Sequence, residues 1–124
     1  MKKIIIAIDS FKGCLTSAEA GKAAEKGIKS INPSCHTSVI PIADGGEGLL
    51  DVLITATKGK YITLSAHGPL MKMAKTHYGL SGNGRTAIIE MAAISGLPLV
   101  PIEQRNPMLT TTFGSGEVIK DALN

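Results

Sequence analysis

Residues 41–48 (PIADGGEG) combine three glycines with two carboxylates, between an apolar stretch and an apolar helical pattern. Asp44 and Glu47 could bind vicinal hydroxyl groups or hold a divalent cation through oxygen atoms, with Asp44 as the candidate metal ligand. Gly45 and Gly46 would let the backbone approach a ligand closely. α/β proteins bind small polar molecules at such strand-to-helix loops. A tight connection in which Glu47 favours the positive end of the following helix explains the same residues without a ligand.

A second polar loop, residues 9–13, follows the first apolar run of the chain. Ser10 and Lys12 could hold an anion there, although the loop is also a plain connection to a helix that begins at the N-cap Thr16. Expected strands at residues 3–8 and 37–42 flank that helix and form a βαβ unit. The first of them is β-branched and apolar, which fits a strand buried on both faces. Because the strands of such a unit end at the same edge of a sheet, we expect the two polar loops to face one crevice.

A third group of polar residues lies near the carboxyl end of the chain. Arg105 carries a planar guanidinium group suited to a carboxylate or a phosphate. Thr111 and Thr112, followed by Gly114 and Gly116, precede an expected helix whose first N–H groups could bind phosphate. Threonine-rich helix starts also occur as ordinary caps, so both interpretations stay open.

After Gly48 the pattern changes from βαβ to an antiparallel β-meander. A helix is expected up to residues 58–59, followed by strands at 61–66, 71–80 and 85–91, whose connections are rich in glycine. A short helix at 92–94 and the opening of an amphipathic helix at 117–123 complete the chain. The fold class is therefore α/β, with a βαβ start followed by a mixed segment. Val118, Ile119 and Leu123 form an apolar face that no later strand covers, which suggests self-association and a chain that stops early.

Composition excludes several classes of protein. The net charge of +3 comes from scattered residues, and the chain has two Phe, two Tyr and no Trp, which disfavours nucleic-acid binding. The longest apolar run, residues 4–8, is too short to cross a membrane. Cys14 and Cys35 lack a disulfide or metal pattern, which favours the cytoplasm. The three histidines are dispersed and are interpreted as incidental rather than as ligands, and neither common nucleotide-binding fingerprint occurs.

Taken together, these segments resemble the N-terminal part of the bacterial glycerate kinases of the first type. The resemblance is collinear over essentially all 124 residues. The chain departs from the family at Ile8, where Pro is usual, and at Met71, where Gly is frequent. Family members are considerably longer, so the resemblance implies an N-terminal fragment. The matching runs are IIAIDSFKG (5–13), PIADGGEG (41–48), GPL (68–70), TAIIEMA (86–92), SGLPLVP (95–101), RNP (105–107), TTT (110–112) and GSGE (114–117).

The resemblance implies ATP-dependent phosphorylation of a hydroxyl group of D-glycerate with Mg²⁺. Such an enzyme must neutralise triphosphate charge, orient the hydroxyl group and hold the substrate carboxylate. Lys12 and Arg105 then become anion-binding candidates, while Ser10, Asp44 and Glu47 are candidates for contacts with the substrate hydroxyl or the metal. No residue is identified as the general base.

The family's architecture implies a flavodoxin-like domain, which residues 1–47 would begin, and a second mixed α/β domain, to which residues 48–124 would belong. Two other functions remain open. The chain could be a small α/β module that binds an anionic metabolite without catalysis, or an inactive structural fragment that assembles with copies of itself.

Overall fold

The structure is a computed structural model that describes residues 3–124. It divides into two compact units, an N-terminal unit (Met1–Val52) and a C-terminal unit (Leu53–Asn124). The helix α2 (Leu49–Thr57) runs across this division. The boundary expected between residues 47 and 48 stays a prediction. None of the helices in the described part of the chain has the length and apolar character needed to span a bilayer.

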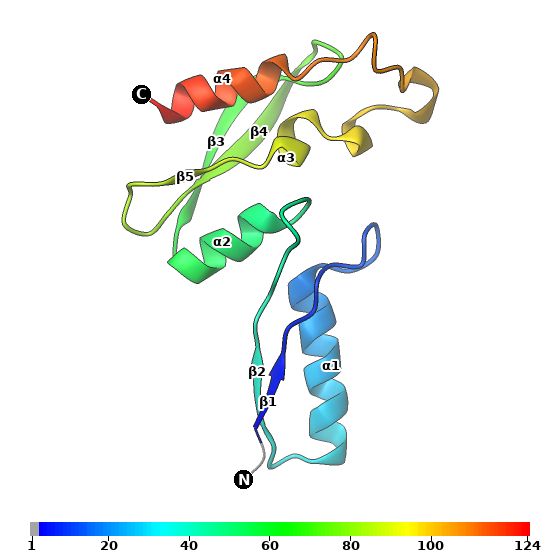
Figure 1. Cartoon of the computed structure of the whole chain (residues 1–124), viewed down its shortest axis with the longest axis vertical. Helices are drawn as coiled ribbons and strands as arrows, with labels where there is room; N and C mark the ends of the chain where they lie inside the picture. The colour runs from blue at the N-terminus through cyan, green and yellow to red at the C-terminus, as the bar shows by residue number, and fades with distance from the viewer. Residues whose placement is uncertain (1–2) are drawn as a thin grey trace. The chain divides into compact units, whose positions relative to one another are not determined.

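The N-terminal unit has the expected strand–helix–strand order (Figure 1). It consists of β1 (Lys3–Ile6), α1 (Ser17–Ile31) and β2 (His36–Val39), and the two strands pair in parallel. Both strands end earlier than expected, at residues 6 and 39 instead of 8 and 42. We expected β1 to be buried on both faces, which is wrong: Ile5 is 60% exposed. This sheet has two strands, with α1 packed against them, so it cannot bury a strand on both faces.

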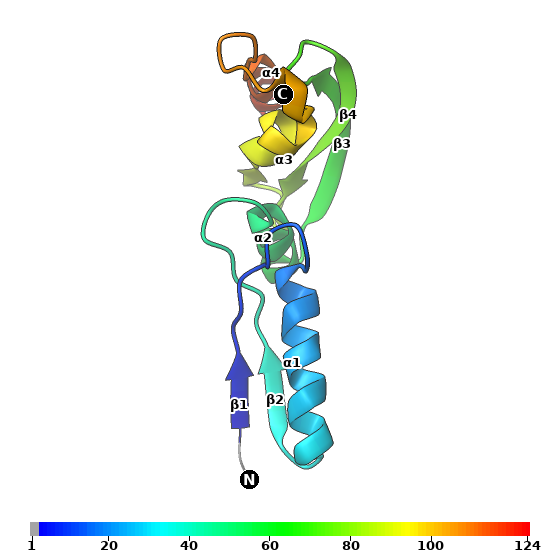
Figure 2. The same ribbon diagram turned by 90° about the vertical axis from the view of Figure 1, so that its right-hand side faces the viewer.

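Local sequence determines where α1 begins and how it packs. Thr16 and Glu19 form the expected capping box, with Thr16 Oγ1 accepting from Glu19 N at 3.2 Å and Glu19 Oε2 accepting from Thr16 N at 2.9 Å. One turn into the helix, Gly21 faces β2 so closely that an added Cβ would lie 2.3 Å from Val39 Cγ1. The helix lies beside β2 (Figure 2) and therefore packs against the strand through a position without a side chain.

The C-terminal unit contains the predicted β-meander. The strands β3 (Lys60–His67), β4 (Met73–Leu80) and β5 (Ala87–Ile88) form an antiparallel sheet in that order. The last strand is much shorter than the expected 85–91 because the chain turns into α3 (Met91–Ser95). Two 3₁₀ turns, η1 (Leu97–Leu99) and η2 (Ile102–Gln104), then lead towards α4 (Phe113–Ala122), which begins four residues before the expected position 117.

The core of the C-terminal unit lies between the sheet and the helices α3 and α4, which cover one of its faces (Figures 1 and 2). Val118 is completely buried there among Ala66, Tyr78 and Ile94. Our expectation that Val118 belongs to an uncovered surface is therefore wrong, because the sheet that covers it precedes it in the chain. Other apolar residues of α4 and its end remain exposed, including Ile119 (48%) and Leu123 (82%).

Candidate functional site

The two polar loops of the N-terminal unit meet, as the βαβ pattern predicts. Lys12 Nζ lies 3.9 Å from Asp44 Oδ2, and the two side chains are 69% and 59% exposed. An exposed ion pair of this length stabilises a fold very little. The contact therefore shows proximity, and it leaves both charged groups accessible to a ligand.

Glycine geometry shapes the loop that carries Asp44. Gly45 and Gly48 have φ values of 96° and 87°, in the left-handed region that other residues rarely adopt. Asp44 Oδ1 accepts a hydrogen bond from Gly46 N at 3.0 Å. This bond fixes one carboxylate oxygen and leaves Oδ2 towards Lys12. Glu47 is exposed two residues before α2, a position that suits both a ligand contact and a favourable interaction with the helix end.

The loop that carries Ser10 and Lys12 is closed at its far end by backbone bonds. Phe11 N donates to Leu15 O at 2.9 Å, and Leu15 N donates to Phe11 O at 3.0 Å. Ser10 N donates to the side chain of Asp9 at 2.6 Å. Lys12 therefore stands on a short, backbone-bonded turn.

Ser17, which the sequence did not mark as part of a site, connects the bases of both loops. Its side-chain oxygen donates to Ile8 O at 2.6 Å and accepts from Ile42 N at 3.0 Å. The residue is buried, with 8% of its surface exposed. The sequence signal is only a serine directly after a helix N-cap, which is common and carries no indication of this role.

The C-terminal unit contains a pocket of about 550 Å³ around Arg105. Arg105 Nε donates to Val100 O at 3.1 Å, which uses one of the five N–H donors of the side chain. The pocket thus combines an anchored cation with hydroxyl groups. Its lining residues are Pro69, Ser95, Leu97, Val100, Arg105, Asn106, Pro107, Thr110, Thr111 and Thr112.

Thr111 and Thr112 lie in the wall of this pocket, at the start of α4. Thr111 N donates to Pro69 O at 3.0 Å, and Thr111 Oγ1 accepts from Phe113 N at 3.1 Å. Thr111 therefore supports the turn that leads into α4, whose N-cap residue is Thr112. Because its oxygen accepts in that bond, its own proton can still be donated to an anion.

Gly114 and Gly116 lie inside α4, which corrects the expectation that they precede the helix. Gly114 is buried against β3, and an added Cβ would lie only 1.8 Å from His67 O. Gly116 is exposed and a Cβ there would meet nothing within 4 Å. Gly114 therefore serves close packing between helix and strand, and its proposed part in phosphate binding is confined to its backbone.

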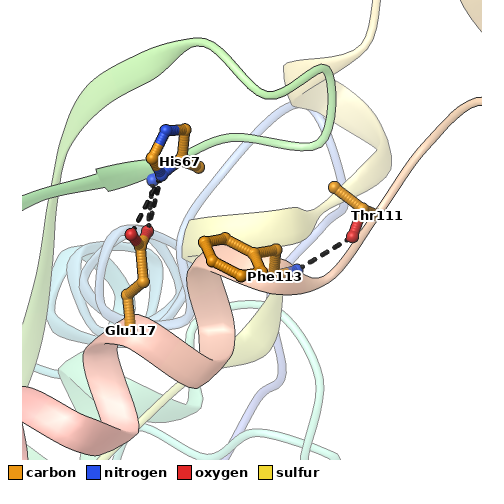
Figure 3. Close-up of polar contacts among 4 residues, drawn as sticks. All are labelled: His67, Thr111, Phe113 and Glu117. Atoms are coloured by element: carbon orange, nitrogen blue, oxygen red, sulfur yellow. Dashed lines mark hydrogen bonds and ion pairs between the residues drawn. The ribbon is translucent and has the colours of Figure 1, made fainter.

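His67 and Glu117 form a polar contact beside this helix start (Figure 3). Glu117 Oε2 accepts from His67 N at 2.7 Å, and His67 Nδ1 lies 2.9 Å from Glu117 Oε1. Donation from the His67 backbone N–H, followed by the bond from its imidazole, lowers the pKa of Glu117 below its ordinary value. The imidazole ring also contacts Phe113 edge-on, with ring centroids 5.5 Å apart. His67 thus has a structural role that the sequence did not indicate, because it fastens α4 to the end of β3.

The predicted site residues thus fall into two groups, one in each compact unit. Ser10, Lys12 and residues 44–47 belong to the N-terminal unit, and Arg105 with residues 111–116 belongs to the C-terminal unit. Within residues 3–124, no three His, Cys, Asp or Glu side chains gather into a group that could hold a metal ion. A cation bound by this part of the chain would rely on a carboxylate such as Asp44 together with oxygen atoms of the ligand.

Comparison with known proteins gives one consistent result. The model of the glycerate kinase family matches residues 4–124. The chain is 51% identical over 122 residues to a glycerate kinase of Bacillus subtilis (strain 168), and 47% identical over 121 residues to a glycerate 2-kinase of Escherichia coli (strain K12). Each match covers 98% of this chain and 32% of the relative, so the chain spans about a third of the length of these curated relatives.

A solved structure shows the same likeness in three dimensions. The crystal structure of a protein provisionally assigned as glycerate kinase 2 from Salmonella typhimurium LT2 matches with a TM-score of 0.80 at 45% identity. The match covers 99% of this chain and 33% of that one.

Proposed function

Because the chain belongs to the glycerate kinase family, we propose that the protein, at the full length of that family, transfers a phosphoryl group from ATP to a hydroxyl group of D-glycerate. The observation that carries this proposal is the match of residues 4–124 to the family, which includes both polar loops and the wall of the Arg105 pocket. In the reaction the hydroxyl oxygen bonds to the γ-phosphorus, the bond to the β-phosphate oxygen breaks, and the hydroxyl proton is taken up by a base.

The N-terminal unit supplies residues for the substrate and the metal. Lys12 would balance negative charge, while Ser10, Asp44 and Glu47 would bind hydroxyl groups of D-glycerate. Gly45 and Gly46 would bring the backbone close to the substrate. Mg²⁺ is commonly held in kinases by one or two carboxylates together with phosphate oxygens, and the exposed Asp44 fits such a role. When bound, the ion would neutralise charge that develops on the phosphates.

The C-terminal unit supplies residues for an anion. Arg105 would bind a carboxylate or phosphate with its remaining N–H donors, and Thr111, Thr112 and the backbone of Gly114 and Gly116 would donate to phosphate oxygens. The volume of about 550 Å³ is in the range of small-molecule pockets. The general base is not assigned to a residue of this chain.

An ADP-release assay with D-glycerate, ATP and Mg²⁺ tests the proposal. The 124-residue chain should be compared with the protein at full family length, and with a chimera in which this chain replaces the matching third of the Bacillus subtilis relative. We expect activity in both longer proteins and not in the 124-residue chain alone. In the chimera, Lys12→Ala should lower kcat/KM by about tenfold or more, because a charge-assisted hydrogen bond is lost. Lys22→Ala, an exposed position of α1, is the matched control.

The other outcomes of this assay separate the remaining functions. Calorimetric binding of an anionic metabolite without activity in any of the proteins would favour the metabolite-binding module. If neither metabolite binding nor kinase activity is found, and stability rises with protein concentration, the result would favour a structural fragment that self-associates through side chains such as Ile119 and Leu123. A cytoplasmic location is part of our proposal, and it agrees with Cys14 and Cys35 forming no disulfide in the described part of the chain.

A further inference from the structure

We propose that Ser17 is a positioning residue of the glycerate site: its hydroxyl group holds the two polar loops of the N-terminal unit at the separation that substrate binding needs. This inference rests on the proposed function. It concerns a residue that makes no contact with the reacting groups itself and acts through the backbone of its neighbours.

Ser17 stands where the regular pairing of the two strands has ended. The last ladder pair joins Ile6 with Val39, and one further backbone bond runs from Ile40 N to Ile6 O at 2.8 Å. Beyond that point, Ser17 Oγ donates to Ile8 O at 2.6 Å and accepts from Ile42 N at 3.0 Å. One hydroxyl group thus provides a connection between the strand ends that the β-ladder no longer makes.

The two bonded groups lie directly before the loops that carry the charges. Ile8 precedes residues 9–13, and Ile42 comes two residues before Asp44. The Lys12 and Asp44 side chains approach to 3.9 Å across these loops. Because that exposed ion pair is weak, it cannot set the separation of the loops by itself. The two bonds of Ser17 are better suited to do so, since the serine is buried and both bonds are partly shielded from water.

The position of the Ser17 hydroxyl is itself well determined. Ser17 is the first residue of α1, directly after the N-cap Thr16, and the capping box fixes the helix start. Gly21, one turn further along the same helix face, approaches β2 closely at Val39. The helix therefore presents the hydroxyl group to the strand ends from a constrained position, which is what a positioning role requires.

The test compares Ser17→Ala with Ser17→Thr, which keeps the hydroxyl group, in the protein at full family length. Ser30→Ala is the matched control, because Ser30 also lies in α1 and its hydroxyl donates within the helix, to Gly27 O at 2.8 Å. We expect Ser17→Ala to raise KM for D-glycerate by about tenfold while KM for ATP changes less, because the loss of preorganisation falls mainly on the loops that bind the substrate. Ser17→Thr should restore most of the affinity, and Ser30→Ala should match the wild type.

Amide hydrogen exchange in the 124-residue chain gives an independent readout. In Ser17→Ala, exchange at Ile42 N–H should become faster, and it should remain unchanged in Ser30→Ala. Faster exchange with an unchanged KM would show a purely structural bond and overturn the proposal. If Ser17→Ala does not fold, Ser17→Cys decides the question, since the thiol is similar in size and a much weaker hydrogen-bonding group.

The two proposals fail in different ways. A wild-type protein of full length without glycerate kinase activity would refute the proposed function, and the substrate role of Ser17 with it. An active wild-type protein whose Ser17→Ala variant keeps its KM for D-glycerate would refute the role of Ser17 alone.

Discussion

Replacing Gly114 by alanine should destabilise the C-terminal unit, while the same change at Gly116 should stabilise it. An added Cβ at Gly114 would lie 1.8 Å from His67 O and 2.9 Å from His67 C, both backbone atoms of β3. A carbon and a carbonyl oxygen in close contact are normally about 3.3 Å or more apart. The helix α4 would therefore have to move by more than about 1 Å, since a strand backbone within a sheet cannot rotate aside as a side chain can.

The magnitude follows from two opposing terms. Alanine is favoured over glycine in a helix by about 1 kcal/mol. Overpacking typically costs about 1–3 kcal/mol, and the contact with backbone at Gly114 points to the upper end of that range. Gly114→Ala should therefore lose about 2 kcal/mol net, whereas Gly116→Ala, which meets nothing within 4 Å, should gain about 0.5–1 kcal/mol. The two variants should differ by about 3 kcal/mol.

Tyrosine fluorescence during urea unfolding of the full chain measures this difference. Tyr61 and Tyr78 are the two tyrosines of the chain, and both lie in the C-terminal unit, so their signal reports on that unit. We expect the midpoints to fall for Gly114→Ala and to rise for Gly116→Ala, with similar m-values. Equal urea midpoints for the two variants would show that the close packing of α4 on β3 at Gly114 does not limit stability, and would refute this reasoning.

Three further predictions concern packing, pH and capping. Gly21→Ala should destabilise the N-terminal unit by about 1–3 kcal/mol, because its Cβ would collide with a valine of β2, while Gly27→Ala on the same helix should be neutral or stabilising; amide hydrogen exchange in α1 measures both, and similar protection would contradict this packing. The pKa of Glu117 is lower in the folded chain than its ordinary value of 4.5, so the ionised carboxylate stabilises the fold at pH values above 4.5. This stabilisation is lost as the pH falls through the lower pKa of the folded state. Urea unfolding at a series of acidic pH values should therefore show that the free energy of unfolding falls less steeply with pH in Glu117→Gln than in the wild type. An identical pH profile would argue against the bonds from His67. Thr16→Ala should cost about 1 kcal/mol, measured by circular dichroism on melting, and an unchanged transition would rule out a stabilising capping box.

Much of the fold could be predicted because it depends on neighbours in sequence. The capping box joins Thr16 and Glu19 within a single helical turn, and the structure confirms it. The βαβ order and the meander follow from alternation of apolar residues and from turns rich in glycine, and both are confirmed. The meeting of Lys12 and Asp44 followed from one topological rule, that strands of a βαβ unit end at the same sheet edge.

The bounds of the elements were less predictable, because they depend on which surfaces are available to pack. Strand β5 has two residues because the chain turns into α3, and α4 already begins at Phe113, where the N–H of Phe113 donates to the Thr111 side chain. Val118 is buried by a sheet that precedes it in the chain, and the helical pattern around Val118 does not indicate this partner.

The sequence by itself determined the family, the order of elements and the polar residues of the two candidate groups, because these reside in residue types and local spacing. Only the tertiary structure revealed which groups bond across the chain. Ser17 meets Ile42 across 25 residues, and His67 meets Glu117 across 50. From the sequence alone, a serine or a histidine could form hydrogen bonds with many partners. Packing determines the partner, because it brings one backbone group within reach and shields the bond from water.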